Sequence, residues 1–363
     1  MFLKRLYLRN FRNYAECEVE FSAKLNHLWG DNAQGKTNLL EAIHFLTVGR
    51  SFRTNISREV IRSNASDYYL DAIFLKDNTE QRLRIAGDGT QRKIIYNDTA
   101  CPSATHLLGL LPSVLIEPDD DLIKGPPRSR RLFIDLQIAQ VDPLYVHYLA
   151  RYNRAMRQRN LLLKNQNLTG IDSWEHEMAQ AAGYVVSKRL ETINRLIPLT
   201  QRLHQQLVGR EEQLSLHYQS RLQMASTAQE IAKNFRTLYS ARERDILTGT
   251  TSQGPHRDDM AVFMSNRDMR SYGSEGEKRT LVAVLRLAGW HLLREQIGEN
   301  PLLLIDDLGI SLDRHRREKL LGYIEGLGQS FVTSPIEPAR ESNHRAFEVA
   351  GGQVLTSKIE LNS

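Results

Sequence analysis

GDNAQGKT, residues 30–37, is the segment from which the architecture of this chain can be inferred. It matches the pattern G-x-x-x-x-G-K-[ST], in which glycines let backbone N–H groups wrap a phosphate, the lysine reaches the outer phosphate oxygens, and the hydroxyl binds Mg²⁺. A strand-like stretch at 18–29 precedes the segment and a helical pattern at 38–45 follows it, so a helix dipole adds to anion binding. We therefore expect a nucleotide site formed by Gly30, Asp31, Asn32, Ala33, Gln34, Gly35, Lys36 and Thr37.

Two acidic residues follow a second buried-strand pattern. PLLLIDD, at 301–307, is an apolar run that ends in Asp306 and Asp307. In P-loop ATPases the first acid supports Mg²⁺ and the second orients or deprotonates the attacking water. For this run alone, a strand that ends in two solvated acids is the better interpretation, but the phosphate loop in the same chain favours a catalytic one. We expect Lys36, Asp306 and Asp307 to act in catalysis, with Thr37 and Asp306 as the Mg²⁺ ligands.

The composition is that of an ordinary globular protein. The chain has 363 residues, 41% of them hydrophobic and 25% charged, with a formal net charge of +5. This mild basicity is compatible with a nucleic-acid partner without requiring one. Cys17 and Cys101 are too far apart for a CxxC site, so we expect a cytoplasmic protein without a disulfide framework. No apolar run is long enough to predict a membrane span, and charges within the first residues argue against a signal peptide.

The pattern of residue types divides the chain into a strand-rich part and a helical insertion. From about 132 to 241 the pattern is helical, and a long helix at 173–207 contains Pro198, which should kink or break it. We expect a head made of residues 1–115 and 242–363 and a helical lobe made of residues 116–241. The strands expected for the head lie at 2–8, 18–29, 68–75, 81–86, 92–96, 260–264, 301–307 and 330–334.

These motifs, in this order, resemble the ABC-type ATPase heads of the SMC superfamily, and within it the RecF family of bacterial recombination mediators. The resemblance covers nearly the whole chain. It implies an α/β fold, an ABC-type P-loop ATPase head with a mixed β-sheet, flanking helices and an inserted helical lobe, and it places Arg12 and Asn13 at the nucleotide. The similar segments are LRNFRNY (8–14), GDNAQGKTNLLEAI (30–43), GRSFRT (49–54), IEPDDDLIKGPPRSRRLFID (116–135) and TSQGPHRDDM (251–260).

The segment SYGSEGEKRT, at 271–280, takes the place of the ABC signature, with Ser274, Gly276 and Arg279 at the matching positions. In the family, the signature helix of one subunit caps the γ-phosphate that the P-loop of the other subunit holds. The resemblance therefore implies an ATP-dependent homodimer. A serine hydroxyl, a glycine N–H and a helix N-terminus together suit an anion.

The chain departs from the family pattern at three places. The signature glutamine is Glu277, whose carboxylate we expect to repel a nearby phosphate and weaken the dimer. Ile310 and Ser311 replace a Ser-Glu pair, and Asp313 beyond them either caps a helix or faces a partner subunit. Where ABC proteins often carry a switch histidine, residues 333–335 read Thr-Ser-Pro, so we expect slow hydrolysis.

Basic side chains gather in three stretches. Solvated surface charge is an equally good interpretation of them, and the resemblance favours contact with a phosphate backbone without base specificity. The candidate DNA-binding residues are Arg50, Arg53, Lys124, Arg128, Arg130, Arg131, Arg151, Arg154 and Arg157.

The leading functional hypothesis is a weak, DNA-linked ATPase that acts as a switch. By resemblance, an ATP dimer would bind single- and double-stranded DNA at gaps or junctions and help load RecA together with RecR and RecO. Two other classes stay open at this point: the ATPase subunit of a membrane transporter and a P-loop metabolic kinase. The long basic stretch between phosphate loop and signature argues against the transporter, and a two-subunit signature has no use in the kinase.

Overall fold

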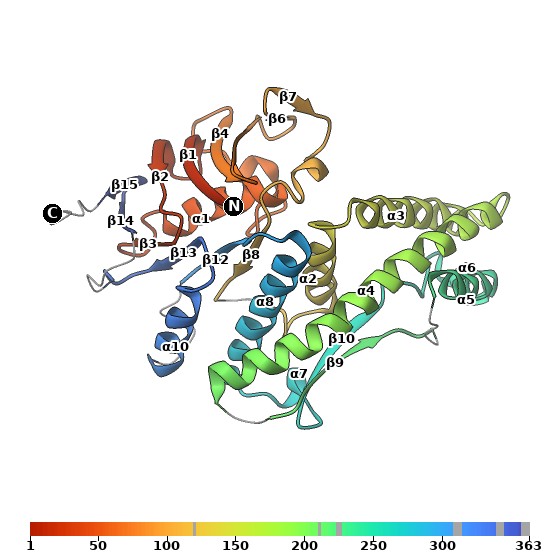
Figure 1. Ribbon diagram of the computed structural model, residues 1–363. Helices are drawn as coiled ribbons and strands as arrows, with labels where there is room; N and C mark the ends of the chain where they lie inside the picture. The colour runs from red at the N-terminus through yellow and green to blue at the C-terminus, as the bar shows by residue number, and fades with distance from the viewer. Residues whose placement is uncertain (119–120, 210–211, 223–226, 308–313, 339–344, 357–363) are drawn as a thin grey trace. The chain divides into compact units, whose positions relative to one another are not determined.

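The computed structural model describes residues 1–118, 121–209, 212–222, 227–307, 314–338 and 345–356 (Figure 1). The chain forms two compact units. We call the first the head unit; it comprises Met1–Asp120, Gln206–Gly209 and Arg279–Ser363. The second, the helical unit, comprises Asp121–Gln205 and Arg210–Lys278.

The head unit contains two six-stranded sheets. The first is antiparallel, in the order β2-β1-β4-β5-β6-β7. Its alternating strands turn apolar side chains such as Leu6, Leu70 and Leu83 to the core, as expected for a sheet with one buried face. The strands are β1 (Phe2–Phe11), β2 (Tyr14–Glu20), β4 (Tyr68–Lys76), β5 (Thr79–Gly87), β6 (Arg92–Tyr96) and β7 (Thr99–Cys101).

The second sheet is mixed, in the order β15-β14-β3-β13-β12-β8. All neighbours pair in parallel except β14 and β15. β8 and β12 are buried along their whole length, which explains their continuous apolar sequences. The strands are β3 (Leu25–Trp29), β8 (Ser113–Ile116), β12 (Leu302–Ile305), β13 (Ser330–Ser334), β14 (Arg345–Ala350) and β15 (Gln353–Thr356).

Helix α1 (Lys36–Val48) connects the two sheets of the head unit. It contacts β1 and β4 of the first sheet and β8 and β13 of the second. The helix is buried on most of its circumference and shares one hydrophobic core with both sheets. Because the phosphate loop leads directly into α1, the position of the loop is set by this core. The remaining head elements are η1 (Ser57–Val60), η2 (Ala104–Leu107) and α10 (Arg314–Ile324).

The helical unit combines a small sheet, in the order β11-β10-β9, with several helices. Its apolar core includes Tyr152, Met178 and Phe235. α8 (Glu275–Ile297) begins in the helical unit and continues into the head unit. The other elements of the unit are α2 (Pro127–Ala139), α3 (Pro143–Lys164), α4 (Ile171–Val208), β9 (Leu214–Gln219), α5 (Ala228–Ser240), α6 (Glu243–Thr248), β10 (Asp259–Met264), β11 (Arg267–Asp268) and α7 (Met269–Tyr272).

Two boundaries differ from those expected. Residues 242–278 belong to the helical unit rather than to the head, because β10 pairs along its whole length with β9. β9 itself lies inside the stretch that reads as helical, so its pairing partner is what makes it a strand. The expected strand at 18–29 is two strands, β2 and β3, which lie in different sheets.

Pro198 does not end the long helix, since α4 runs through it. A proline removes one hydrogen bond, the one that the carbonyl of the residue four positions earlier would accept. That residue is Asn194, and both it and Pro198 are exposed. Water can therefore satisfy the orphaned carbonyl, and the helix continues.

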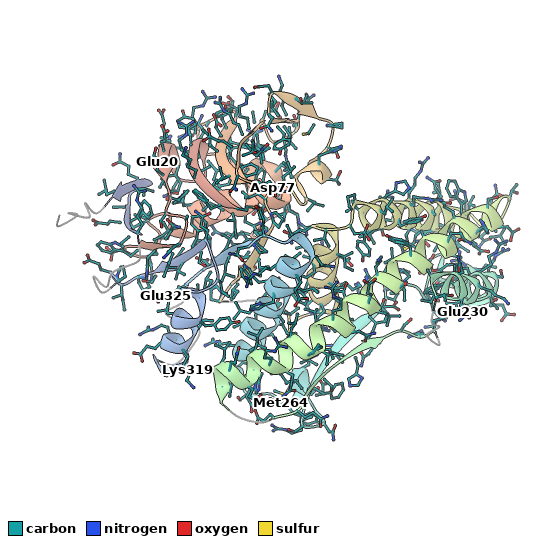
Figure 2. All side chains as sticks on the ribbon, viewed as in Figure 1. Glu20, Asp77, Glu230, Met264, Lys319 and Glu325 are labelled. Atoms are coloured by element: carbon teal, nitrogen blue, oxygen red, sulfur yellow. The ribbon has the colours of Figure 1, made fainter. Side chains whose placement is uncertain are left out.

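Charged side chains, among them Glu20, Asp77 and Glu230, project outward from the ribbon (Figure 2). In the part of the chain that the structure describes, no helix combines the length and apolar character that crossing a bilayer requires.

Burial of His44 in α1 predicts an acid-sensitive head unit. Desolvation lowers the pKa of His44 to about 3, from an ordinary value of 6.5. A depressed folded-state pKa contributes stability above pH 6.5 that is lost as the pH falls toward 3. Between pH 7.5 and about 5.5, this one group should lower the free energy of unfolding by about 1.4 kcal/mol.

Urea unfolding of the unaltered chain and of His44→Gln at both pH values measures this effect. The free energy of unfolding should fall less in the variant than in the unaltered chain, by about 1.4 kcal/mol. An equal loss in both proteins would mean that His44 does not titrate as its burial requires.

Candidate nucleotide site

The phosphate loop requires glycine at both of its ends. Gly30 has φ +137° and Gly35 has φ +124°, values that side-chain-bearing residues rarely adopt. A Cβ on Gly30 would lie 2.5 Å from the carbonyl oxygen of Val349, and one on Gly35 would lie 2.7 Å from Nδ2 of Asn13. The sequence pattern of the loop therefore reflects close backbone packing as well as phosphate chemistry.

The loop is fastened from outside by two other segments. Asn13 donates from Nδ2 to the carbonyl of Gln34 at 2.9 Å. The turn between β14 and β15 donates from the Gly352 N–H to the same carbonyl at 3.0 Å, and from the Gly351 N–H to Oε1 of Gln34 at 2.7 Å. These bonds hold the loop in shape, so its N–H groups need little rearrangement to bind an anion.

Lys36 is the buried cation of the site. Its ammonium donates to the carbonyls of Gly30 at 2.6 Å and of Asp31 at 2.7 Å. Burial lowers the pKa of Lys36, while the charges of Asp307, Asp306 and Asp31 act in the opposite direction. The ammonium of Lys36 thus lies against the phosphate loop, as the sequence motif predicts.

Asp306 joins the loop to the second sheet. Its Oδ1 accepts hydrogen bonds from the hydroxyls of Thr37, at 2.9 Å, and Thr333, at 2.7 Å. The Thr333 hydroxyl in turn accepts from the backbone N–H of Asp307 at 2.7 Å. The structure therefore brings together Thr37 and Asp306, the two predicted Mg²⁺ ligands, at the carboxyl ends of β12 and β13.

The oxygen ligands of this cluster fit Mg²⁺, which prefers hard oxygen donors and keeps several water or phosphate ligands. Among the described residues, no group of three or more His, Cys, Asp or Glu side chains could hold a metal by itself. A hydroxyl and one carboxylate next to a phosphate loop match a metal that shares its ligands with a nucleotide.

The loop and Asp307, the second residue of the acidic pair, share one cavity of about 340 Å³. Asp307, which follows β12 with φ +48°, reaches this cavity. Lys36, Thr37 and Asp307 thus face the same space although Asp307 is far from the other two in sequence. The lining consists of Asn32, Ala33, Gly35, Lys36, Thr37, Asn38, Arg53, Asp307 and Thr333.

Arg53 is at this cavity, whereas the sequence suggested a DNA contact for it. Its Nη1 donates to Oδ1 of Asn38 at 2.7 Å and lies 3.7 Å from Oε2 of Glu41. Asn38, Arg53 and Thr333 are the lining residues that sequence reasoning missed in this role. No spacing rule connects the segment 49–54 to the phosphate loop, so only the fold reveals it.

Arg12 is not among the residues that line the cavity. Its guanidinium donates to both carboxylate oxygens of the buried Glu41, at 2.9 and 2.6 Å, and to the carbonyl of Glu59 at 2.6 Å. Asn13 is likewise absent from the lining but holds the loop, as described above. Direct nucleotide contact by either residue stays a prediction.

The signature residues Ser274 and Gly276 lie in the helical unit at the start of α8. The Ser274 N–H donates to Oε2 of Glu277 at 2.8 Å, and the Glu277 N–H donates to the Ser274 hydroxyl at 3.3 Å. This reciprocal pair is a capping box, in which Glu and Gln serve equally well. The structure does not describe Ile310, Ser311 or Asp313.

The basic candidates differ in how far their side chains are buried. Arg130 is only 3% exposed and pairs with Asp259 through two bonds, of 2.7 and 2.8 Å, so we withdraw it as a DNA contact. Arg131 donates to the carbonyl of Asp258, and Arg151 binds both carboxylate oxygens of Glu177. The exposed candidates are Arg50, Arg53, Lys124, Arg128, Arg154 and Arg157.

Replacing Thr333 tests the bridge through Asp306. Thr333→Val keeps the shape of the side chain but removes the hydroxyl that serves both Asp306 and the Asp307 N–H. Leaving these buried groups without that partner should lower the free energy of unfolding by about 1–3 kcal/mol. Thr333→Ser keeps the hydroxyl and should lose less. Urea unfolding compares the three proteins, and equal losses in both variants would contradict the bridge.

Comparisons with known proteins agree with this geometry. The family model described as RecF/RecN/SMC N terminal domain matches residues 2–355. A DNA replication and repair protein RecF from Protochlamydia amoebophila (strain UWE25) is 45% identical over 92% of this chain and 94% of its own length. One from Symbiobacterium thermophilum is 38% identical over 98% of both chains.

Solved structures of RecF and of an Smc head domain resemble this chain as well. The recombination mediator protein RecF, described as RecF-ATP in the RecFOR pathway, superposes with a TM-score of 0.91, at 28% identity over 98% of both chains. An Smc head domain from Pyrococcus furiosus, at 15% identity and a TM-score of 0.57, shares the fold. The expected ABC-type head with its mixed sheet is confirmed. The chain belongs to the RecF/RecN/SMC N-terminal domain family, and within that family to the RecF proteins of DNA replication and repair.

Proposed function

We propose that the chain is an ATP-driven, DNA-binding switch of recombinational repair and replication restart. The observation that carries this proposal is the single cavity that Lys36, Thr37 and Asp307 share, with Asp306 bonded to Thr37 at its edge. Family membership supports the repair context, and the RecF structure described with ATP supports the ligand.

Each residue of the cavity has a role in this proposal. The loop N–H groups and Lys36 bind the β- and γ-phosphates, and Thr37 and Asp306 hold Mg²⁺. The Mg²⁺ would neutralise phosphate charge. Asp307 orients the attacking water or accepts its proton, and Arg53 adds a second cation to the lining. Hydrolysis resets the switch.

Assembly is the second part of the proposal. Ser274 and Gly276 would cap the γ-phosphate bound by a second copy, which makes the dimer depend on ATP. The dimer would engage single- and double-stranded DNA at gaps or junctions and load RecA together with RecR and RecO, in the cytoplasm. The RecFOR pathway named for the solved relative supports this set of partners.

DNA contact would use the exposed basic residues Arg50, Lys124, Arg128, Arg154 and Arg157. Such contacts to phosphates carry affinity without sequence preference.

Family membership also decides among the classes that the sequence left open. The RecF relatives match over nearly the full chain, which favours the repair ATPase over a transporter subunit or a metabolic kinase.

Removal of the loop cation tests the nucleotide site. Lys36→Met should abolish ATP-induced dimerisation, because the ammonium that neutralises the phosphates is gone. Sedimentation velocity with and without ATP measures the dimer fraction. Lys24→Met, which removes an exposed lysine of the same unit, is the matched control and should dimerise normally. A dimer that persists in Lys36→Met would refute the assignment of the loop.

Glu277 allows the signature to be tested by charge alone. Since glutamine also satisfies a capping box, Glu277→Gln keeps the capping bonds at the start of α8. It removes one negative charge, and with it the ion pair with Nη2 of Arg267 at 3.8 Å. With less repulsion toward the partner's phosphate, the ATP dimer should tighten several-fold. Glu277→Ala removes the box as well and should not tighten it to the same extent. The measurement is the dimer dissociation constant of each protein with a non-hydrolysable ATP analogue. An unchanged constant in the Gln variant would contradict repulsion between Glu277 and the phosphate.

A further inference from the structure

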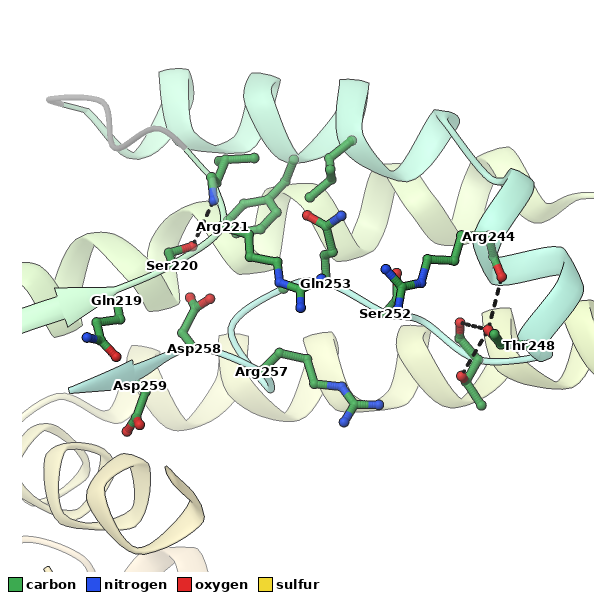
Figure 3. A pocket seen from close by; sticks show the side chains of 15 residues that line it. Gln219, Ser220, Arg221, Arg244, Thr248, Ser252, Gln253, Arg257, Asp258 and Asp259 are labelled. Carbon is green, nitrogen blue, oxygen red and sulfur yellow. Dashed lines mark hydrogen bonds between the residues drawn. The ribbon is translucent and has the colours of Figure 1, made fainter. Parts of the chain in front are cut away.

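We propose that a second cavity, within the helical unit, is a binding site for the phosphodiester backbone of DNA. The cavity measures about 570 Å³ and is lined in part by Arg221, Arg244 and Arg257 (Figure 3). None of these arginines was a candidate in the sequence analysis. The inference rests on the proposed function, since it names a surface through which the DNA partner is held.

The three arginines reach the cavity from three different segments. Arg221 follows β9, Arg244 lies on α6, and Arg257 is in the loop that leads to β10. In Figure 3 the side chains of Gln253 and Ser252 lie on the loop between Arg221 and Arg244. The tertiary structure therefore gathers charges that are dispersed along the chain.

These three guanidinium groups form no ion pair with any residue that the structure describes, and all three side chains are exposed. Three like charges around one concave surface repel each other and create a positive potential within it. An anion that enters the cavity relieves that repulsion.

The acidic residues at the cavity are already engaged elsewhere. Asp259 is paired with Arg130, as described above. Asp258 is buried and accepts a hydrogen bond from the hydroxyl of Tyr218 at 2.7 Å. Burial raises the pKa of Asp258, which reduces its tendency to carry a full negative charge. The cavity is therefore positive in balance.

The loop 251–258 that carries Ser252, Gln253 and Arg257 is held firmly by the unit beneath it. The Thr251 N–H donates to Asn160 at 2.8 Å, and the Ser252 N–H donates to Asp245 at 3.0 Å. Further along the loop, Arg189 donates to the carbonyl of Pro255 at 2.7 Å.

Gly254 in the same loop has φ +132°, and a Cβ there would lie 2.4 Å from the hydroxyl oxygen of Tyr152. The backbone of the segment TSQGPHRD is thus fixed before binding, so little backbone entropy is left to lose when a ligand binds.

The donor set fits phosphodiesters better than carboxylates. Arginine forks bind phosphate and carboxylate oxygens alike. The hydroxyls of Thr248, Thr250 and Ser252 and the Gln253 amide add neutral donors of the kind that contact DNA backbones. The lining also includes the apolar side chains of Leu222 and Leu238, which suit sugars and bases beside the phosphates. The positive charge of the cavity suits either kind of anion, and its neutral donors and apolar residues favour a nucleic-acid strand over an acidic protein segment.

The salt dependence of DNA binding tests the site. The experiment uses the full chain with ATP and a duplex that carries a single-stranded gap. The variant Arg221→Gln/Arg244→Gln/Arg257→Gln should bind more weakly, and the slope of log K against log salt should flatten by about 0.9 for each phosphate that the variant no longer neutralises. The matched control, Arg58→Gln/Arg62→Gln/Arg202→Gln, removes the same charge at exposed positions that do not line the cavity. It should keep a slope close to that of the unaltered chain.

Both variants should retain ATP-induced dimerisation and thermal unfolding like the unaltered chain, because all six side chains are exposed. Equal slopes for the cavity variant and the control would overturn the inference while leaving the proposed function intact. A polyglutamate peptide that binds the unaltered chain but not the cavity variant, with DNA binding unaffected, would overturn it in favour of an acidic protein partner. If the unaltered chain does not bind the gapped duplex, the proposed function and the inference both fail.

Discussion

The carboxylate of Asp306 accepts hydrogen bonds from Thr37 and Thr333, and the geometry of the nucleotide site depends on this pair of bonds. They connect the helix after the phosphate loop with the ends of two neighbouring strands. Asp306 is 9% exposed, so a carboxylate at this place needs such donors to offset its lost hydration. The same two residues whose side chains position the loop, Thr37 and Asp306, are those expected to hold the metal, which couples the fold of the head unit to its chemistry.

The surroundings of the loop follow the same logic. Glycines permit the close approach of Val349 and Asn13, and the hydrogen bonds of Gln34 fasten the loop to the turn that follows β14. α1 is buried between strands of both sheets and cannot shift without disturbing the core. Preorganised N–H groups contribute more to phosphate binding than flexible ones, because little of the binding free energy is spent on ordering them.

Arginine serves two distinct purposes in the helical unit. Arg159 is fully buried and binds Glu175, Asp245 and other acceptors, so it organises the core in place of apolar contacts. Burying such a network is not by itself a source of stability, but breaking one partner would leave a charge without compensation. Arg221, Arg244 and Arg257 lie exposed around a cavity instead. Residue type alone does not distinguish the two groups of arginines. The difference lies in the acceptors that surround each guanidinium.

The sequence alone was sufficient for the features that depend on short stretches of chain. The phosphate loop, the apolar strand ending in two acids and most strands of the head could be predicted, because each is encoded by a local pattern of residue types. Features that depend on partners far away in the sequence could not be predicted in this way. β9 is a strand because β10 pairs with it, and Arg130 is buried because Asp259, 129 positions away, supplies its counter-charge. Arg53 lines the cavity of the phosphate loop for the same kind of reason. The environment of a charged side chain is set by what the fold places around it, and only the tertiary structure decided that.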